Sequence, residues 1–232
     1  MTGFCLIHGA WHDAACWDDV ARILRERGHE VVAPDLPYHD PEAGHDERVR
    51  PALEALEGAT GPVVVVGHSM GSAYAPIVAA RRSESLLVHL CPRLGPFDPG
   101  PEAPAGPFRT GMRLPSPGPD GLSVWDPDEA IYAMYGRLAP ETARALAARL
   151  RPLAPPADAF PLPGHPDVPT ALVYAVDDEF FEPEWERHMA RMVIGIEPIE
   201  IVGGHFPMAE APEALADLLE RLFERPAPDA RR

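Results

Sequence analysis

The 232-residue chain has no lysine, only three cysteines and no long apolar run. A transmembrane helix needs about 20 consecutive apolar residues, so we expect no segment to span a membrane. Cys5, Cys16 and Cys91 are odd in number and lack metal-type spacing, which favours reduced thiols over a disulfide framework. The first residues lack a basic segment followed by an apolar stretch with a cleavage site, so we expect a cytoplasmic protein.

Positive charge is also scarce. All 20 basic residues are arginine, and 36 acidic residues bring the net charge to −16. Such a surface repels the phosphate backbone of nucleic acids and anionic membranes alike, and no basic stripe with interleaved aromatic residues offsets it. The expected partner is therefore a small-molecule substrate, with neither nucleic acid nor a membrane involved; the oligomeric state is left open.

The histidines and aspartates of one loop raise the question of a metal site. Asp35, His39, Asp40, His45 and Asp46 lie close in sequence. Their spacing matches no ordinary metal site, and the prolines between them indicate a loop after a strand end. We therefore predict neither a metal nor a cofactor.

The most informative feature present is a valine strand that leads into Gly67-His68-Ser69-Met70-Gly71. Four consecutive valines, residues 63–66, precede the Gly-x-Ser-x-Gly motif, and an apolar segment typical of a buried helix, residues 72–79, follows it. Strand, sharp turn and helix in this order predict a nucleophile elbow, which exposes a serine above the carboxyl end of a parallel strand. The alternative is that Ser69 is a buried turn serine.

A nucleophilic serine needs a base and a carboxylate that orients the base. Strand-like residues 168–176 end in Asp177-Asp178-Glu179, and strand-like residues 196–202 close on Gly203-Gly204-His205. The order of serine, acid and histidine is that of α/β-hydrolases. His205 could instead cap a loop, and one or two of the adjacent acids could be solvated turn residues. Asp98 is a weaker candidate for the acid.

These motifs give the chain a resemblance to the α/β-hydrolase superfamily, over nearly its whole length. His8-Gly9-Ala10-Trp11-His12 and the segment 178–185 are similar in particular to small plant esterases and hydroxynitrile lyases. The resemblance places the acid five residues before a proline, which selects Asp178, because Pro183 fits that spacing. We predict that backbone N–H groups of Ala10 and Met70 form an oxyanion hole, which stabilises the negative oxygen of the transition state.

The resemblance implies a mostly parallel sheet flanked by helices, in one domain with an inserted segment. Alternating strands and helices assign residues 1–91 and 167–232 to the core. Residues 92–166 are rich in proline and glycine, carry short helical signals at 127–137 and 140–151, and are predicted to be a cap. The predicted substrate-binding side chains are Trp11, Phe206, Trp125, Tyr132 and Tyr135.

The function expected from these residues is hydrolysis of a small or medium, largely apolar ester, thioester or lactone through an acyl-enzyme. The same residues could serve a lyase, a cyclase or a carbon–carbon bond hydrolase, or a receptor that binds a small molecule without turnover. Plant hydroxynitrile lyases carry a lysine after the histidine, where this chain has Phe206. Cyanohydrin cleavage by the plant mechanism is therefore not expected.

Overall fold

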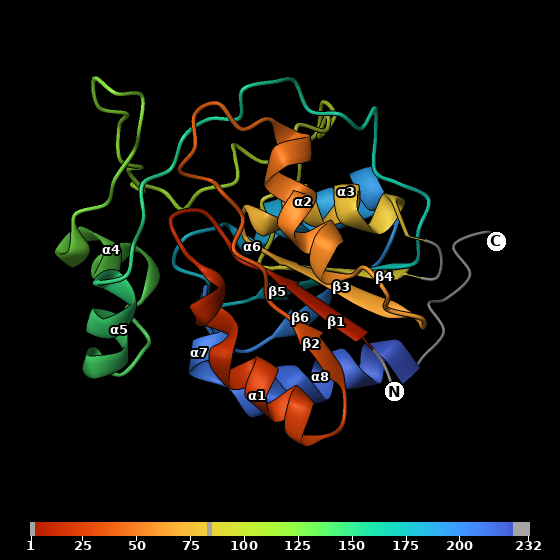
Figure 1. Ribbon diagram of the computed structural model, residues 1–232. Helices are drawn as coiled ribbons and strands as arrows, with labels where there is room; N and C mark the ends of the chain where they lie inside the picture. The colour runs from red at the N-terminus through yellow and green to blue at the C-terminus, as the bar shows by residue number, and fades with distance from the viewer. Residues whose placement is uncertain (1–2, 83–84, 225–232) are drawn as a thin grey trace.

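The computed structural model describes residues 3–82 and 85–224 of the chain. Residues 1–2, 83–84 and 225–232, which belong to the predicted core segments, lie outside the described residues. A six-stranded, fully parallel sheet in the order β2-β1-β3-β4-β5-β6 forms the centre of the molecule (Figure 1). The strands are β1 Gly3–Ile7, β2 Glu30–Val32, β3 Val63–His68, β4 Ser85–Leu90, β5 Thr170–Ala175 and β6 Ile199–Ile201.

Both faces of the sheet are buried, as the unbroken valine run of β3 predicts for a central parallel strand. Val64 and Val66 point into the apolar layer beneath one set of helices. Val63 and Val65 point into the layer on the opposite face. The predicted strand of residues 63–66 is confirmed, and it lies between β1 and β4 in the interior of the sheet.

Helices cover both faces of the sheet (Figure 1). On one face lie α1 Asp18–Glu26 and α8 Pro212–Glu224, whose apolar side chains share one core with β1 and β3. The opposite face carries α2 His45–Ala55, α3 Gly71–Ala80 and α6 Pro183–Met189. The predicted class of a parallel sheet between helices is therefore confirmed.

The sequence explains where several helices begin and end. Val20 and Leu24 of α1 are fully buried one turn apart, and Gly28 follows the helix with φ 88°, a conformation that glycine adopts without strain. Residues 14–17 form a short 3₁₀ turn before α1. Residues 190–194 extend α6 by a π-helical turn, and a single helical turn, α7 Pro207–Glu210, follows the histidine loop. These short pieces were not predicted.

Residues 92–166 contain two helices, α4 Pro127–Met134 and α5 Pro140–Ala147, which lie together at one side of the sheet domain (Figure 1). Proline occupies the first turn of both, and the Asp126 side chain caps α4 by accepting hydrogen bonds from two backbone N–H groups. Both helices are shorter than predicted. At Tyr135 the backbone leaves the helical conformation, with φ −126°, and a turn carries the chain toward α5.

β6 is also shorter than the predicted strand of residues 196–202. Pro198 directly before it cannot donate a backbone hydrogen bond, and the strand pairs with β5 over only three residues. Among the described residues, no helix is long and apolar enough to span a bilayer.

Candidate active site

Ser69 lies on a sharp turn between β3 and α3. Its φ of 50° is in the left-handed region, which side chains other than glycine rarely adopt, and its N–H donates to the Leu90 carbonyl of β4 at 3.0 Å. The flanking glycines permit close backbone approach. A Cβ on Gly67 would lie 2.6 Å from the Gly71 carbonyl oxygen, and one on Gly71 would lie 2.6 Å from the His8 oxygen. The Gly-x-Ser-x-Gly spacing therefore has a steric cause.

His205 lies on the loop after β6, and Asp178 lies on the loop after β5. Their side chains are buried and joined by a bond of 2.8 Å from His205 Nδ1 to Asp178 Oδ2. The N–H groups of Phe180 and Phe181 donate to Asp178 Oδ1 at 2.7 and 2.8 Å. A carboxylate fixed in this way can only accept, so Nδ1 of His205 carries the proton and Nε2 of the neutral ring is free to act as a base.

The other candidate acids make different contacts. Asp177 forms an ion pair with Arg137, at 3.5 Å. Glu179 accepts the backbone N–H of His205 at 3.0 Å, and burial raises the pKa of its carboxyl group. Asp98 lies in a loop, where it accepts the N–H of Gly100. Of the four acids considered, Asp178 is the one bonded to the imidazole.

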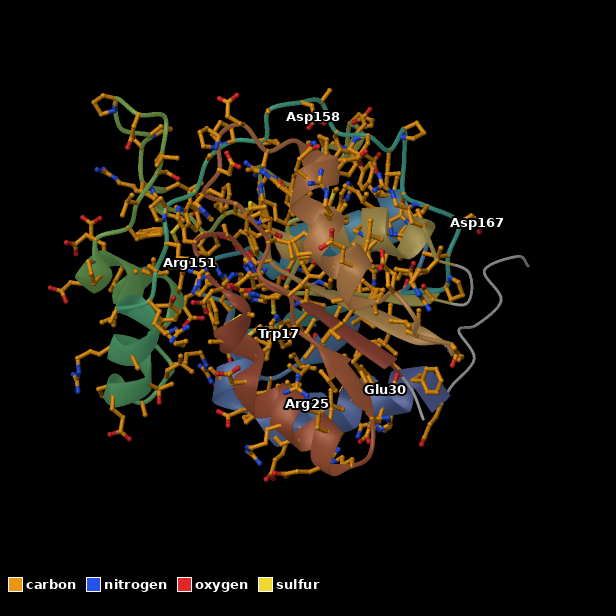
Figure 2. All side chains as sticks on the ribbon, in the orientation of Figure 1. Trp17, Arg25, Glu30, Arg151, Asp158 and Asp167 are labelled. Carbon is orange, nitrogen blue, oxygen red and sulfur yellow. The ribbon has the colours of Figure 1, made fainter. Side chains whose placement is uncertain are left out.

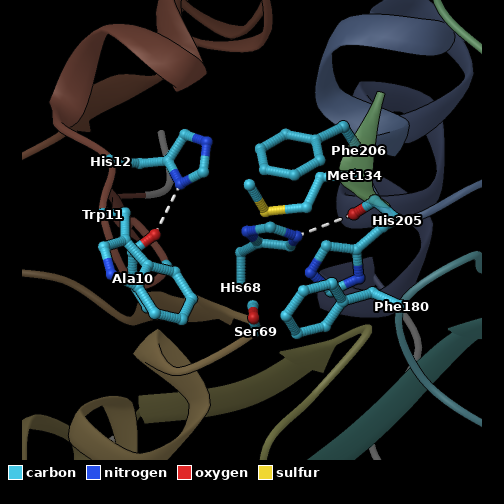
Figure 3. Close-up of a pocket in the computed structure, with 10 residues that line it drawn as sticks. Ala10, Trp11, His12, His68, Ser69, Met134, Phe180, His205 and Phe206 are labelled. Carbon is cyan, nitrogen blue, oxygen red and sulfur yellow. Dashed lines mark hydrogen bonds between the residues drawn. The ribbon is translucent and has the colours of Figure 1, made fainter. Parts of the chain in front are cut away.

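A small, narrow pocket lies over Ser69. Figure 3 shows Ser69 at the lower edge of the group, His205 and Phe180 at one side, and His12 and Phe206 across from Ser69. Apolar and aromatic side chains make up most of the lining, which is typical of small-molecule sites. The lining residues are Gly9, Ala10, Trp11, His12, His68, Ser69, Met134, Phe180, His205 and Phe206.

Two of the five predicted substrate-binding residues, Trp11 and Phe206, line this pocket. Trp125 and Tyr135 are buried behind it: Trp125 packs edge-on against Trp11, and Tyr135 against Phe206. Tyr132 is 87% exposed and lies outside the pocket. Its place on the outer side of α4 does not support a contact with substrate.

The predicted oxyanion donors lie near the serine, since Ala10 lines the same pocket and Met70 directly follows Ser69 in the chain. Ala10 lines the pocket, and within the described parts of the chain its N–H donates no hydrogen bond. Met70, half-buried, follows Ser69 and opens α3, so its N–H belongs to the positive end of a helix dipole. Ala10 therefore borders the pocket and Met70 does not line it, and the role of both as oxyanion donors stays a prediction.

Three further buried histidines lie in or next to the loops of the site, and two of them, His12 and His68, line the pocket. Burial lowers the pKa of His8 and His68, and it lowers the pKa of His12 to about 3. Leu36 N–H donates to His8 Nε2 at 3.0 Å, so His8 Nδ1 carries the proton and donates to the Gly9 carbonyl. His68 Nε2 donates to the His205 carbonyl at 2.8 Å. These contacts hold the loops that carry the site.

Sequence reasoning did not select His12, Met134 and Phe180 as lining residues. His12 ends the motif that begins at His8, and Phe180 follows the acid, so both stood next to a recognised signal. For Met134 the only signal in the sequence was its position in an apolar stretch of the inserted segment. Among residues 3–82 and 85–224, no three histidine, cysteine or acidic side chains gather closely enough to hold a metal ion.

Comparison with known proteins agrees with this geometry. Residues 6–218 match the Alpha/beta hydrolase family. The chain belongs to this family. It is 26% identical to a pyrethroid hydrolase of Sphingobium wenxiniae, over 98% of this chain and 89% of that protein. Methylesterase 9 of Arabidopsis thaliana is 35% identical over 88 residues, 34% of each chain.

Solved structures show the same fold over almost the whole chain. Polyneuridine aldehyde esterase superposes with a TM-score of 0.75 and 20% identity, covering 96% of this chain and 99% of that one. A pyrethroid hydrolase of Sphingobium faniae gives a TM-score of 0.73 and 23% identity, with 97% and 98% covered. Together with the family match, these structures agree on the α/β-hydrolase fold of the chain.

Proposed function

We propose that the protein hydrolyses small, largely apolar carboxylic esters, with Ser69 as nucleophile, His205 as base and Asp178 as the orienting acid. The observation that carries this proposal is the bond between His205 Nδ1 and Asp178, in a pocket that His205 shares with a strained, glycine-flanked Ser69. Serine is a weak nucleophile at neutral pH, and this arrangement supplies the base that activates it.

The reaction proceeds in two halves. Ser69 Oγ attacks the ester carbonyl while its proton moves to His205 Nε2, and the carbonyl oxygen becomes an oxyanion facing the N–H groups of Ala10 and Met70. The tetrahedral intermediate collapses, the alkoxide leaves with the proton from Nε2, and Ser69 holds the acyl group. Water then gives a proton to Nε2, attacks the acyl-enzyme and releases the acid with Ser69 restored.

The pocket lining supports an uncharged, apolar substrate. Trp11, Met134, Phe180 and Phe206 surround Ser69, and the neutral state of His12 adds no charge. The names of the relatives, a pyrethroid hydrolase and a methylesterase, point toward esters as well. Phe206 follows His205 where a lysine would be needed for cyanohydrin cleavage, which favours hydrolysis over that lyase reaction.

Two further features belong to the proposal. Residues 92–166 act as the cap, because Met134 at the end of α4 closes one wall of the pocket. The three cysteines are buried and unpaired, which suits the reducing conditions of the cytoplasm.

The test is steady-state hydrolysis of a panel of short-chain p-nitrophenyl esters by the natural protein and its variants. We expect Ser69→Ala and His205→Ala to remove turnover. Asp178→Asn should lower kcat by about 10⁴-fold, because the amide N–H would donate to Nδ1 of His205 and leave the proton on Nε2, the wrong tautomer for a base. The matched control is Asp177→Asn, which changes the neighbouring acid and should retain activity. Loss of activity in Asp177→Asn with retention in Asp178→Asn would contradict the assignment.

A further inference from the structure

The loop that carries Ala10 is bonded at Trp11 to the inserted segment. Trp11 has φ 61°, a left-handed conformation that is strained for a tryptophan. Such a conformation persists only where surrounding contacts hold it. Its carbonyl accepts the N–H of Arg151 at 2.8 Å, and its indole Nε1 donates to Ser123 Oγ at 3.1 Å. Arg151 lies where the inserted segment returns to the sheet domain (Figure 2).

His12 makes the next connection, and its two hydrogen bonds fix its tautomer. His12 Nδ1 lies 2.6 Å from the Ala10 carbonyl oxygen, which can only accept, so Nδ1 carries the proton (Figure 3). Nε2 of the neutral ring must then accept a hydrogen bond. The Tyr135 hydroxyl, directly after α4, donates to it. A directed chain of bonds thus runs from Tyr135 through His12 to the Ala10 carbonyl.

Burial keeps His12 and Tyr135 uncharged. His12 is 7% exposed and Tyr135 is 1% exposed. Burial lowers the pKa of His12 to about 3 and raises the pKa of Tyr135 far above its usual range, so both groups are neutral across the physiological range. Phe206 packs against both rings, with centroids 4.7 Å from His12 and 4.9 Å from Tyr135.

We propose that His12 and Tyr135 are positioning residues of the oxyanion hole, through which the inserted segment fixes the orientation of the Ala10 backbone. The His12 bond to the Ala10 carbonyl holds the peptide adjacent to the Ala10 N–H, and Tyr135 holds His12. The position of α4 then determines the orientation of the Ala10 N–H group. This inference rests on the proposed ester hydrolysis.

Three variants test the two hydrogen bonds separately. Tyr135→Phe removes only the hydroxyl, and His12→Phe removes both bonds. His12→Asn keeps an N–H donor close to the position of Nδ1. Misplacing a catalytic group by about 1 Å costs roughly 100-fold in rate. We therefore expect kcat to fall roughly 10- to 100-fold in Tyr135→Phe and His12→Phe with KM little changed, and His12→Asn to recover part of the loss.

The matched control is Tyr174→Phe. Tyr174 is a buried tyrosine of β5 whose hydroxyl bonds to Glu200 and Arg187 and which does not line the pocket. Tyr174→Phe removes a buried tyrosine hydroxyl, as Tyr135→Phe does, and its kcat should equal that of the natural protein. A second readout is the inhibition constant of a trifluoromethyl ketone, whose serine adduct carries an oxyanion. Its affinity should weaken in Tyr135→Phe by the same factor as kcat/KM.

The outcomes are distinct. Unchanged kcat and unchanged ketone affinity in Tyr135→Phe would overturn the positioning role while leaving the proposed function intact. Equal losses in His12→Asn and His12→Phe would overturn the role of the Nδ1 donor. Should His12→Phe fail to fold, Tyr135→Phe and His12→Asn decide the question. Natural protein that hydrolyses no ester would refute the proposed function itself, and the inference with it.

Discussion

Glu186 of α6 is a buried acid whose replacement should stabilise the protein. Its side chain is 1% exposed, and among the described residues neither carboxyl oxygen has a hydrogen-bond partner. Burial raises the pKa of Glu186 well above its usual range, and the nearby charge of Asp178 raises it further. Burial and the Asp178 charge therefore favour the protonated, neutral form of Glu186 in the folded protein.

The sign of the pH dependence follows from this state. An unfolded glutamate has a pKa of about 4.3 and releases its proton above that pH, while folded Glu186 keeps it. Each pH unit above about 4.3 then lowers the free energy of unfolding by about 1.4 kcal/mol, until the raised pKa is reached. The loss stops growing once the pH passes the raised pKa of Glu186. Glu186→Gln removes it, because glutamine binds no proton in either state.

The assay is urea unfolding of the natural protein and Glu186→Gln at pH 5, 6 and 7. We expect the stability advantage of the variant to grow with pH, by up to about 1.4 kcal/mol per pH unit while folded Glu186 keeps its proton. Glu184→Gln, an exposed glutamate on the same helix, is the matched control and should show no such trend. Both variants should keep kcat at pH 7. An advantage of Glu186→Gln that does not change with pH would refute the reasoning.

Three further predictions concern the core and the pocket. The Arg48 guanidinium is fully buried and donates to backbone carbonyls and Tyr74, so Arg48→Ala should lower the free energy of unfolding by about 3 to 5 kcal/mol in urea; a loss under about 1 kcal/mol would contradict this. His12 ring signals should not titrate between pH 5 and 8 by NMR, since its pKa lies at about 3; a midpoint near 6 would be inconsistent with its burial. Gly71→Ala should remove ester hydrolysis, because the new Cβ would lie 2.6 Å from the His8 carbonyl oxygen; full activity would show that the turn tolerates a side chain.

The sequence predicts the centre of the molecule well, because local patterns determine it. The valine run of β3 requires burial on both faces, and the glycines beside Ser69 meet a steric demand of the turn itself. The placement of His205 and Asp178 follows from the loop positions after β6 and β5, since the carboxyl ends of parallel strands meet at one edge. The catalytic roles of these residues stay predictions until activity is measured.

The inserted segment is where sequence reasoning failed to place side chains. Tyr132 and Tyr135 are three residues apart and similar in character, but Tyr132 faces solvent from α4 whereas Tyr135 lies past the helix end and turns inward. The bond between Tyr135 and His12 joins residues 123 positions apart. Local sequence periodicity cannot predict such a contact, because it depends on how distant segments pack together.

The most direct test of the proposed chemistry is the intact mass of the protein after incubation with a fluorophosphonate, with Ser69→Ala as the matched variant. The reagent forms a stable bond only with an activated serine, because a base must accept the hydroxyl proton as the oxygen attacks phosphorus. We predict one adduct on the natural protein and none on Ser69→Ala. A folded natural protein that gains no adduct, or a Ser69→Ala variant that gains the same one, would contradict the assignment of Ser69 as the nucleophile.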